Sequence, residues 1–150
     1  MKIKSFTPLI AVFGTSFLIT ITLLKSFQIY MGISICLLAM LKLMDIEAFG
    51  TSYKKYDLIS SKFDGWIYIY PFSELLIGIS FINSSPPSLI LFIALILGIS
   101  GMISVFKAVY LDKLKLNCAC IGGYVKTPLG SISFIENLLM AIMSFLILIK

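Results

Sequence analysis

The sequence contains no arginine and no histidine, and all twelve of its basic residues are lysines. Without histidine, the chain lacks the usual general base near neutral pH and a common metal ligand. Charged residues are also few: they make up 13% of the 150 residues, whereas a soluble domain has about a quarter. Because 59% of the residues are hydrophobic, the composition excludes an ordinary soluble domain and indicates a membrane protein.

Five apolar segments approach or reach the length of about 20 residues that a helix needs to cross a bilayer. They are residues 8–24, 27–44, 66–83, 87–110 and 131–149. We therefore expect an all-α membrane protein, a bundle of about five transmembrane helices. The first segment could instead be a secretory signal peptide, but no small-residue cleavage site follows it.

The lysines predict how the chain is oriented in the membrane. If the N-terminus is cytoplasmic, two of the twelve lysines, Lys25 and Lys150, lie outside, and the other ten lie at or near the cytoplasmic face. Positive charge gathers on the cytoplasmic side of membrane proteins. This distribution predicts a multi-pass membrane protein with an external C-terminus.

Residues 51–63, between the second and third segments, suggest a further helix. Thr51 is a candidate N-cap, and four apolar or aromatic side chains share one helical face: Tyr53, Tyr56, Ile59 and Phe63. This pattern is typical of a helix lying in the membrane interface. An irregular loop is the alternative.

Two cysteines stand close together in segment 111–130. Cys118 and Cys120 are separated by one residue and followed by Gly122 and Gly123. A disulfide within such a small ring is strained, and strained disulfides tend to be catalytic or labile rather than structural. Two nearby lysines favour the thiolate, and the glycines let the backbone bend or approach a partner. The pattern predicts a catalytic dithiol, with incidental loop cysteines as the alternative.

The same thiols could instead bind a soft metal such as Cu(I). A third cysteine, Cys36, lies in the second apolar segment, where a free cysteine usually packs as a small hydrophobe. A structural zinc site needs about four ligands, which a chain without histidine does not readily supply. We therefore expect no metal and no cofactor, and keep a soft-metal path through Cys36, Cys118 and Cys120 as the alternative.

Two of the apolar segments contain carboxylates. Glu74 lies well inside the third segment, shortly after Pro71, whose ring can kink the helix and free a backbone carbonyl. A carboxylate inside a membrane is costly and is a functional hypothesis by default. The alternative is a structural ion pair with Lys42 or Lys107. Glu136 lies near the start of the last segment, where it also suits the positive end of a helix dipole.

These positions converge in the five-helix arrangement. Lys42, Glu74, Lys107 and Glu136 fall in the half of the membrane that also meets the cysteine-containing segment. We therefore expect one polar intramembrane site capped by a dithiol loop. The expected supporting residues are Asp45, Pro71, Gly122, Gly123 and Asn137.

Six short motifs follow one another between residues 30 and 149. They are Leu41-Lys42-Leu43-Met44-Asp45 with Phe49, Tyr56-Asp57-Leu58-Ile59, Tyr70-Pro71-Phe72-Ser73-Glu74-Leu75, Val105-Phe106-Lys107-Ala108, Cys118-Ala119-Cys120-Ile121-Gly122 and Glu136-Asn137-Leu138-Leu139. In this order and spacing they resemble the methylamine utilisation protein MauE family, within the wider MauE/DoxX group of redox-associated membrane proteins.

The resemblance implies a four-helix membrane domain over residues 27–150, preceded here by an N-terminal transmembrane helix over residues 1–26. It also implies a role in the processing, transport or maturation of the disulfide-rich small subunit of methylamine dehydrogenase, which is periplasmic. The location that the resemblance implies is the inner (cytoplasmic) membrane of a bacterium. The chain departs from the family in having Ile121-Gly122-Gly123, where phenylalanine-glycine often follows the second cysteine. Its lysines also place the thiols on the cytoplasmic side.

Three functions remain open from the sequence. The first is a membrane thiol–disulfide protein that assists the maturation of another protein. The second is a membrane protein that handles or transports a soft metal of the copper or mercury type, and the third is a structural membrane subunit. The expected partners are the lipid bilayer and a thioredoxin-like or client protein. Nucleic acid is not expected, because the lysines form no single patch.

Overall fold

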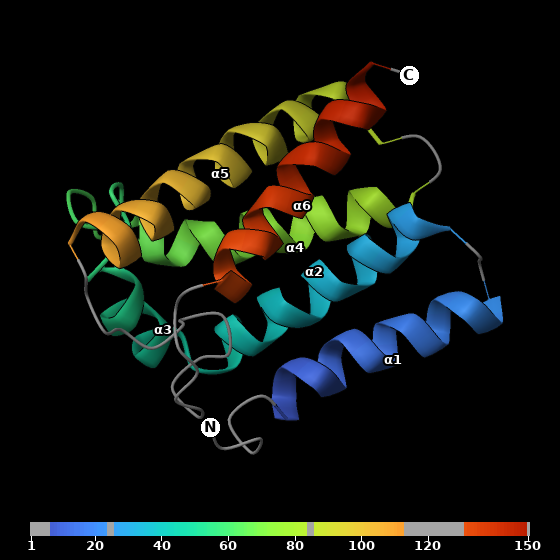
Figure 1. The fold of residues 1–150 in the computed structure, drawn as a ribbon, viewed down its shortest axis with the longest axis horizontal. Coiled ribbons are helices and arrows are strands. Elements are labelled where there is room, and N and C mark those ends of the chain that lie inside the picture. Colours follow the sequence, from blue (N-terminus) through green and yellow to red (C-terminus); the bar gives the residue numbers. More distant parts are fainter. Residues whose placement is uncertain (1–6, 24–25, 84–85, 113–130, 150) are drawn as a thin grey trace.

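The computed structural model describes residues 7–23, 26–83, 86–112 and 131–149, and within them every regular element is helical (Figure 1). The elements are α1 (Thr7–Leu23), α2 (Phe27–Met44), α3 (Ile46–Tyr53), α4 (Trp66–Ile82), α5 (Ser88–Phe106), the π-helix η2 (Lys107–Leu111) and α6 (Ser131–Leu148). The expected all-α fold class is confirmed. Each of the five apolar segments coincides closely with a helix, and η2 continues α5.

Two of the described helices are long and apolar enough to cross a membrane. They are Phe27–Met44 and Ser88–Leu111. Three other helices are apolar but shorter: Ile10–Ile21, Trp66–Ile82 and Ser133–Leu148. Within the described residues, the structure thus gives two clear candidates for membrane spans, and the count of five stays a prediction.

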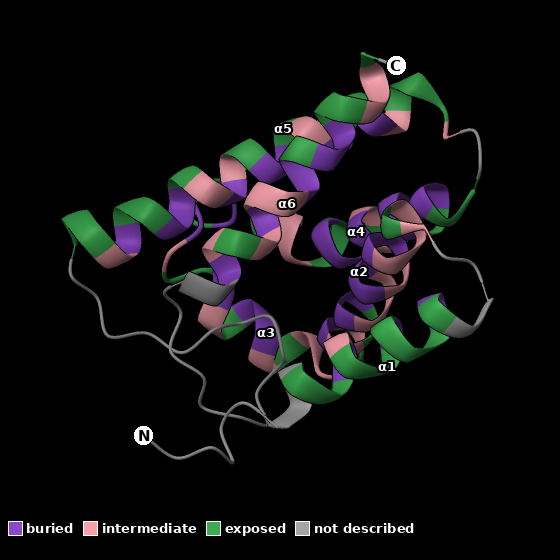
Figure 2. Cartoon of the chain, turned by 45° about the vertical axis from the view of Figure 1, so that its right-hand side comes forward, coloured by how far each residue is buried: buried purple, intermediate pink, exposed green. Residues whose placement is uncertain are grey.

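The outer surface of the helices is apolar. On α5, Leu89 is 73% exposed, and Phe92, Ile96 and Ile103 are also exposed. The exposed positions follow the outside of the helices, while the buried ones face inward (Figure 2). In water such a surface would be a liability, but lipid tails are as apolar as these side chains.

Glycines bring the helices together in two close pairs. Where α2 packs on α4, a Cβ added to Gly32 would lie 2.8 Å from the carbonyl oxygen of Gly78. Where α5 packs on α6, a Cβ added to Gly98 would lie 2.8 Å from the carbonyl oxygen of Asn137. Small residues permit such close backbone contact between membrane helices. Helix α1 packs against α2.

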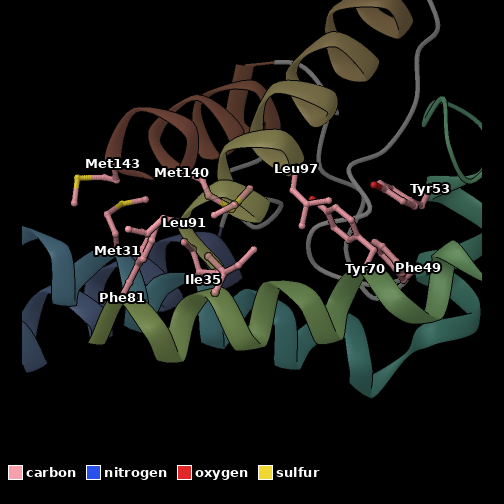
Figure 3. Packing of buried hydrophobic residues seen from close by; sticks show 12 residues of the cluster. Met31, Ile35, Phe49, Tyr53, Tyr70, Phe81, Leu91, Leu97, Met140 and Met143 are labelled. Carbon is pink, nitrogen blue, oxygen red and sulfur yellow. The ribbon is translucent and has the colours of Figure 1, made fainter. Parts of the chain in front are cut away.

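The two pairs share one apolar core (Figure 3). Its members from α2, α4, α5 and α6 are Met31, Ile35, Ile77, Phe81, Leu91, Ala94, Leu97, Met140 and Met143. The same cluster continues into the aromatic side chains of Phe49, Tyr53 and Tyr70. This aromatic end of the core contacts the polar site described below.

The prediction of an interface helix over residues 51–63 is wrong. The helix in this region is α3, which begins at Ile46 and ends at Tyr53, and turns follow it. Asp45 caps it, because its side chain accepts a hydrogen bond from the backbone N–H of Ala48 at 3.1 Å. Aspartate is a stronger N-cap than threonine, so the helix starts earlier than Thr51. Tyr53 is consequently buried rather than facing the interface.

Candidate functional site

A buried ion pair joins α2 to α4. Lys42, in the last turn of α2, donates hydrogen bonds to both carboxylate oxygens of Glu74, at 2.6 and 2.5 Å. Each side chain is only 4% exposed. A cation in the last turn also suits the negative end of the α2 dipole. Two short hydrogen bonds and the burial of both side chains therefore hold the Lys42–Glu74 ion pair between α2 and α4.

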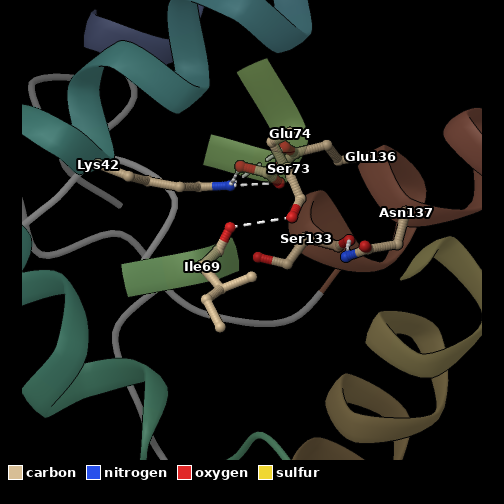
Figure 4. A network of polar contacts seen from close by, with 7 residues as sticks. All are labelled: Lys42, Ile69, Ser73, Glu74, Ser133, Glu136 and Asn137. Carbon is tan, nitrogen blue, oxygen red and sulfur yellow. Dashed lines mark hydrogen bonds and ion pairs between the residues drawn. The ribbon is translucent and has the colours of Figure 1, made fainter. Parts of the chain in front are cut away.

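A second carboxylate faces the same ammonium from α6. The Oε1 atom of Glu136 lies 3.8 Å from Nζ of Lys42, and the Glu136 side chain is 10% exposed. Figure 4 shows the Lys42 side chain pointing toward Glu74, with Glu136 beside Glu74. The ion cluster of Lys42, Glu74 and Glu136 thus connects the α2–α4 pair to the α5–α6 pair. With one ammonium and two carboxylates, it carries one excess negative charge when all three groups are ionised.

Aromatic rings cover the ammonium of Lys42. Its Nζ atom lies 5.2 Å from the ring centroid of Tyr70 and 6.0 Å from that of Phe49. Tyr53 stacks on Phe49, with centroids 4.8 Å apart, and packs at a tilt against Tyr70, with centroids 4.9 Å apart. The negative faces of aromatic rings attract a cation at this range. Burial, reinforced by the charge of Asp57, raises the pKa of Tyr53 well above its usual value, so its hydroxyl stays neutral.

A small polar cavity lies beside the ion cluster. It offers about 20 Å³ to water and is lined by Lys42, Phe49, Tyr53, Tyr56, Asp57, Tyr70, Gly101, Ser104, Val105, Ser133, Glu136 and Asn137. A polar cavity of about 10–15 Å³ already accommodates one water molecule. The cavity can therefore hold a water in reach of a carboxylate and neutral hydroxyls, which is an arrangement suited to moving a proton.

Asp57 forms one wall of this cavity. Its carboxylate accepts hydrogen bonds from the backbone N–H groups of Ile59 and Ser60, at 3.1 and 2.7 Å, and from the hydroxyl of Ser104 at 3.2 Å. Asp57 is 2% exposed. These bonds fix the turns after α3 against α5 and so close the cavity on this side.

The sequence pattern of the family described as methylamine utilisation protein MauE matches residues 9–150. The chain belongs to the MauE family. The match confirms the resemblance expected from the six motifs. It begins within α1 and includes every residue of the ion cluster. No curated protein and no solved structure matches the chain. Family membership and the two long apolar helices identify it as a membrane protein.

Three of the expected supporting residues of this MauE chain lie near the cluster. Asn137 is buried, lines the cavity and donates a hydrogen bond to the backbone oxygen of Ser133 at 2.8 Å. Pro71 is buried inside α4, one turn before Glu74. Asp45 supports the site indirectly, because it caps α3, the helix that carries Phe49 and Tyr53.

Other expected site residues lie elsewhere. Lys107 begins η2 with an exposed side chain, outside the buried cluster. Cys36 packs at the α2–α4 contact, where its thiol donates to the backbone oxygen of Leu75 at 3.9 Å. The predicted site residues of segment 111–130 are Cys118, Cys120, Gly122 and Gly123, and they lie outside the described residues.

Six polar residues of this cavity were not predicted as site residues from the sequence: Tyr53, Tyr56, Asp57, Tyr70, Ser104 and Ser133. The sequence pattern predicts Tyr53 at the membrane interface, and the motif that contains Asp57 carries no predicted role. Nothing in the sequence marks the two serines as site residues, because serine is common in apolar helices, where its hydroxyl hydrogen-bonds to the preceding turn.

Proposed function

We propose that this MauE-family membrane protein assists the thiol–disulfide maturation of another protein through a dithiol formed by Cys118 and Cys120. By resemblance, the client is the disulfide-rich small subunit of methylamine dehydrogenase. The membrane is the bacterial inner membrane, and a thioredoxin-like protein is an expected partner.

One observation carries the proposal. In the chain, the segment containing the Cys118-Ala119-Cys120 motif follows the continuous α5–η2 helix and precedes α6. Residues of both α5 and α6, including Ser104 and Ser133, line the cavity beside Lys42 and Glu136. A dithiol exchanges protons whenever it is oxidised or reduced, so a proton-accepting site lined by the two helices that flank its segment in the chain fits this chemistry.

The proposed reaction is disulfide exchange. A client thiolate attacks one sulfur of the Cys118–Cys120 disulfide, forming a mixed disulfide while the other cysteine leaves as a thiolate. The second client thiolate attacks the mixed disulfide and releases the remaining cysteine as a thiolate. The client gains a disulfide, and the pair is reduced by two electrons. In this proposal, the ion cluster exchanges the protons of the two thiols.

Serine substitutions test the proposal. Cys118→Ser and Cys120→Ser are each expected to abolish client oxidation, and the double variant should be no worse, because the two residues act as one unit. One of the single variants should trap a mixed disulfide with the client. Cys36→Ser is the matched control, and its packing position predicts near-normal activity.

Soft-metal handling would give a different result. It requires thiol-dependent Cu(I) binding and a Cys36→Ser defect equal to that of the other two cysteines. In the described part of the chain, no group of three or more Cys, Asp or Glu side chains could hold a metal ion. Cysteines 118 and 120 that stay reduced in cells and bind Cu(I) tightly would refute the dithiol proposal.

A further inference from the structure

Glu136 borders a second cavity, which differs in character from the first. This cavity lies between α1, α2 and α6 and has a volume of about 130 Å³. Its apolar lining residues are Phe13, Met31, Ile35, Leu38, Ile135 and Leu139. Only two lining residues are polar, Ser34 and Glu136. Among the lining residues of these two cavities, Glu136 is the one they share.

The size and lining of the apolar pocket fit one six-membered ring. An apolar cavity of about 150 Å³ stays dry and accepts benzene, and this pocket is nearly as large. Ser34 donates its hydroxyl hydrogen to the backbone oxygen of Tyr30 at 2.9 Å. Among the described residues of the pocket wall, the side chain left to donate a hydrogen bond to a ring substituent is therefore Glu136 in its protonated form.

The ion cluster favours a proton on Glu136. Lys42 holds Glu74 through two short hydrogen bonds but lies 3.8 Å from Glu136. Glu136 is therefore the less well compensated of two buried carboxylates, in a cluster with one excess negative charge. A buried charge without a close partner is costly and tends to be neutralised. A proton there removes the excess charge and supplies a donor to the apolar pocket.

We propose that the apolar pocket binds the ring of a membrane-soluble quinone, with a quinone carbonyl accepting a hydrogen bond from Glu136. A quinone combines the features that the pocket selects: a six-membered ring, oxygen acceptors and solubility in lipid. Glu136 passes a proton between the quinone in the apolar pocket and water in the polar cavity.

The redox role of the bound quinone rests on the proposed function. The Cys118–Cys120 dithiol loses two electrons and two protons, so two S–H bonds break and one S–S bond forms. The quinone gains two electrons and two protons, and its two carbonyl oxygens become the hydroxyls of the quinol. The quinone is thus the oxidant that restores the disulfide after each client is oxidised.

Binding is tested apart from this redox chemistry. The purified full-length Cys118→Ser/Cys120→Ser protein in nanodiscs is titrated with decylubiquinone. Leu139→Phe fills the pocket and is expected to raise the dissociation constant at least tenfold, since overpacking a filled site is strongly unfavourable. Leu138→Phe makes the same change on a neighbouring residue outside the pocket lining and should stay within about twofold. Thermal unfolding of both variants shows whether each is folded.

A photoreactive quinone locates the site even if Leu139→Phe unfolds. Labelling is expected on the α2 and α6 peptides that contain Ile35 and Leu139, and not on the α5 peptide that contains Ala94. Glu136→Leu should weaken binding about three- to tenfold through loss of the hydrogen bond. In the protein with intact cysteines, Glu136→Gln should keep quinone binding but slow quinol formation.

Two results would overturn the inference. One is equal quinone affinity in Leu139→Phe and Leu138→Phe when both are folded. The other is displacement of the quinone by decanol at equal concentration, which would identify the pocket as a lipid-chain site. Quinone binding without any trapped client would instead refute the proposed function and leave the inference standing, and a trapped client without quinone binding would do the reverse.

Discussion

Substitution of Glu74 by glutamine separates its contribution to function from its contribution to folding. The change keeps the shape of the side chain and one acceptor for Lys42, but it removes a buried negative charge. Breaking a buried ion pair usually costs about 3–5 kcal/mol, because the remaining charge has no partner. Here Glu136 stays 3.8 Å from Nζ of Lys42 and can serve as its counter-ion.

The cluster therefore predicts an order of destabilisation. Glu74→Gln leaves one ammonium and one carboxylate, so its cost should be limited to the charged hydrogen bonds, about 1–2 kcal/mol. Lys42→Met leaves two buried carboxylates without a cation and should cost about 3–5 kcal/mol. Glu136→Gln leaves the Lys42–Glu74 pair intact and should cost less than either. Glu47→Gln, at an exposed carboxylate of α3, is the control and should be silent.

Thermal unfolding in detergent measures this order. One kcal/mol corresponds to roughly 2–4 °C for a chain of this size, so Lys42→Met and Glu74→Gln should be clearly resolved. Client oxidation by folded Glu74→Gln should nevertheless fall, because the charge that holds Lys42 in place is gone. If Glu74→Gln were as destabilising as Lys42→Met, Glu136 would not be acting as a counter-ion. If its activity were unchanged, Glu74 would have only a structural role.

Three further predictions concern packing, topology and pH. Gly78→Ala should destabilise the protein by about 1–3 kcal/mol, because the added Cβ would lie 2.6 Å from Sγ of Cys36. Gly14→Ala is the matched control, because there is open space around Gly14. Equal unfolding temperatures of the two variants would refute the close contact. Reporter fusions at Lys150 and between residues 83 and 87 should both report the outside, whereas an internal C-terminus would mean that one span is assigned wrongly. Burial raises the pKa of Tyr53 above 10.0, so the contribution of Tyr53 to stability is complete below that pH and is lost as the pH rises further. Tyr53→Phe should therefore lose less stability than the parent protein between pH 9 and 11. Parallel curves of stability against pH would contradict this prediction.

The sequence predicted the helices well because length and apolarity decide where they form in a membrane protein. It could not choose the partner of Glu74, since Lys42 and Lys107 fall in the same half of the expected bundle. The choice depends on the rotation of each helix about its axis. The contact of Gly32 with Gly78 sets that rotation for α2 and α4 and directs Lys42 inward, whereas Lys107 is exposed at the start of η2.

The aromatic part of the site was missed for a local reason. The sequence suggests a helix cap at Thr51, and a helix starting there directs Tyr53 toward the membrane interface. The actual cap, Asp45, begins the helix earlier and ends it at Tyr53, so this ring is buried against Phe49 and Tyr70. A cap shifted by a few residues thus moved a cavity residue to the opposite surface of the predicted protein.

Contact with lipid does not favour one arrangement of the two helix pairs over another. Apolar side chains lose nothing by facing lipid instead of protein, so hydrophobicity does not fix how α6 is rotated against α2 and α4. The ion cluster does fix it, because any rotation that carries Glu136 away from Lys42 exposes an ionisable carboxyl group to hydrocarbon. The same constraint holds Glu136 between the polar cavity and the apolar pocket. Glu136 therefore both sets the packing of the two helix pairs and lies where it can exchange a proton between the polar cavity and the apolar pocket.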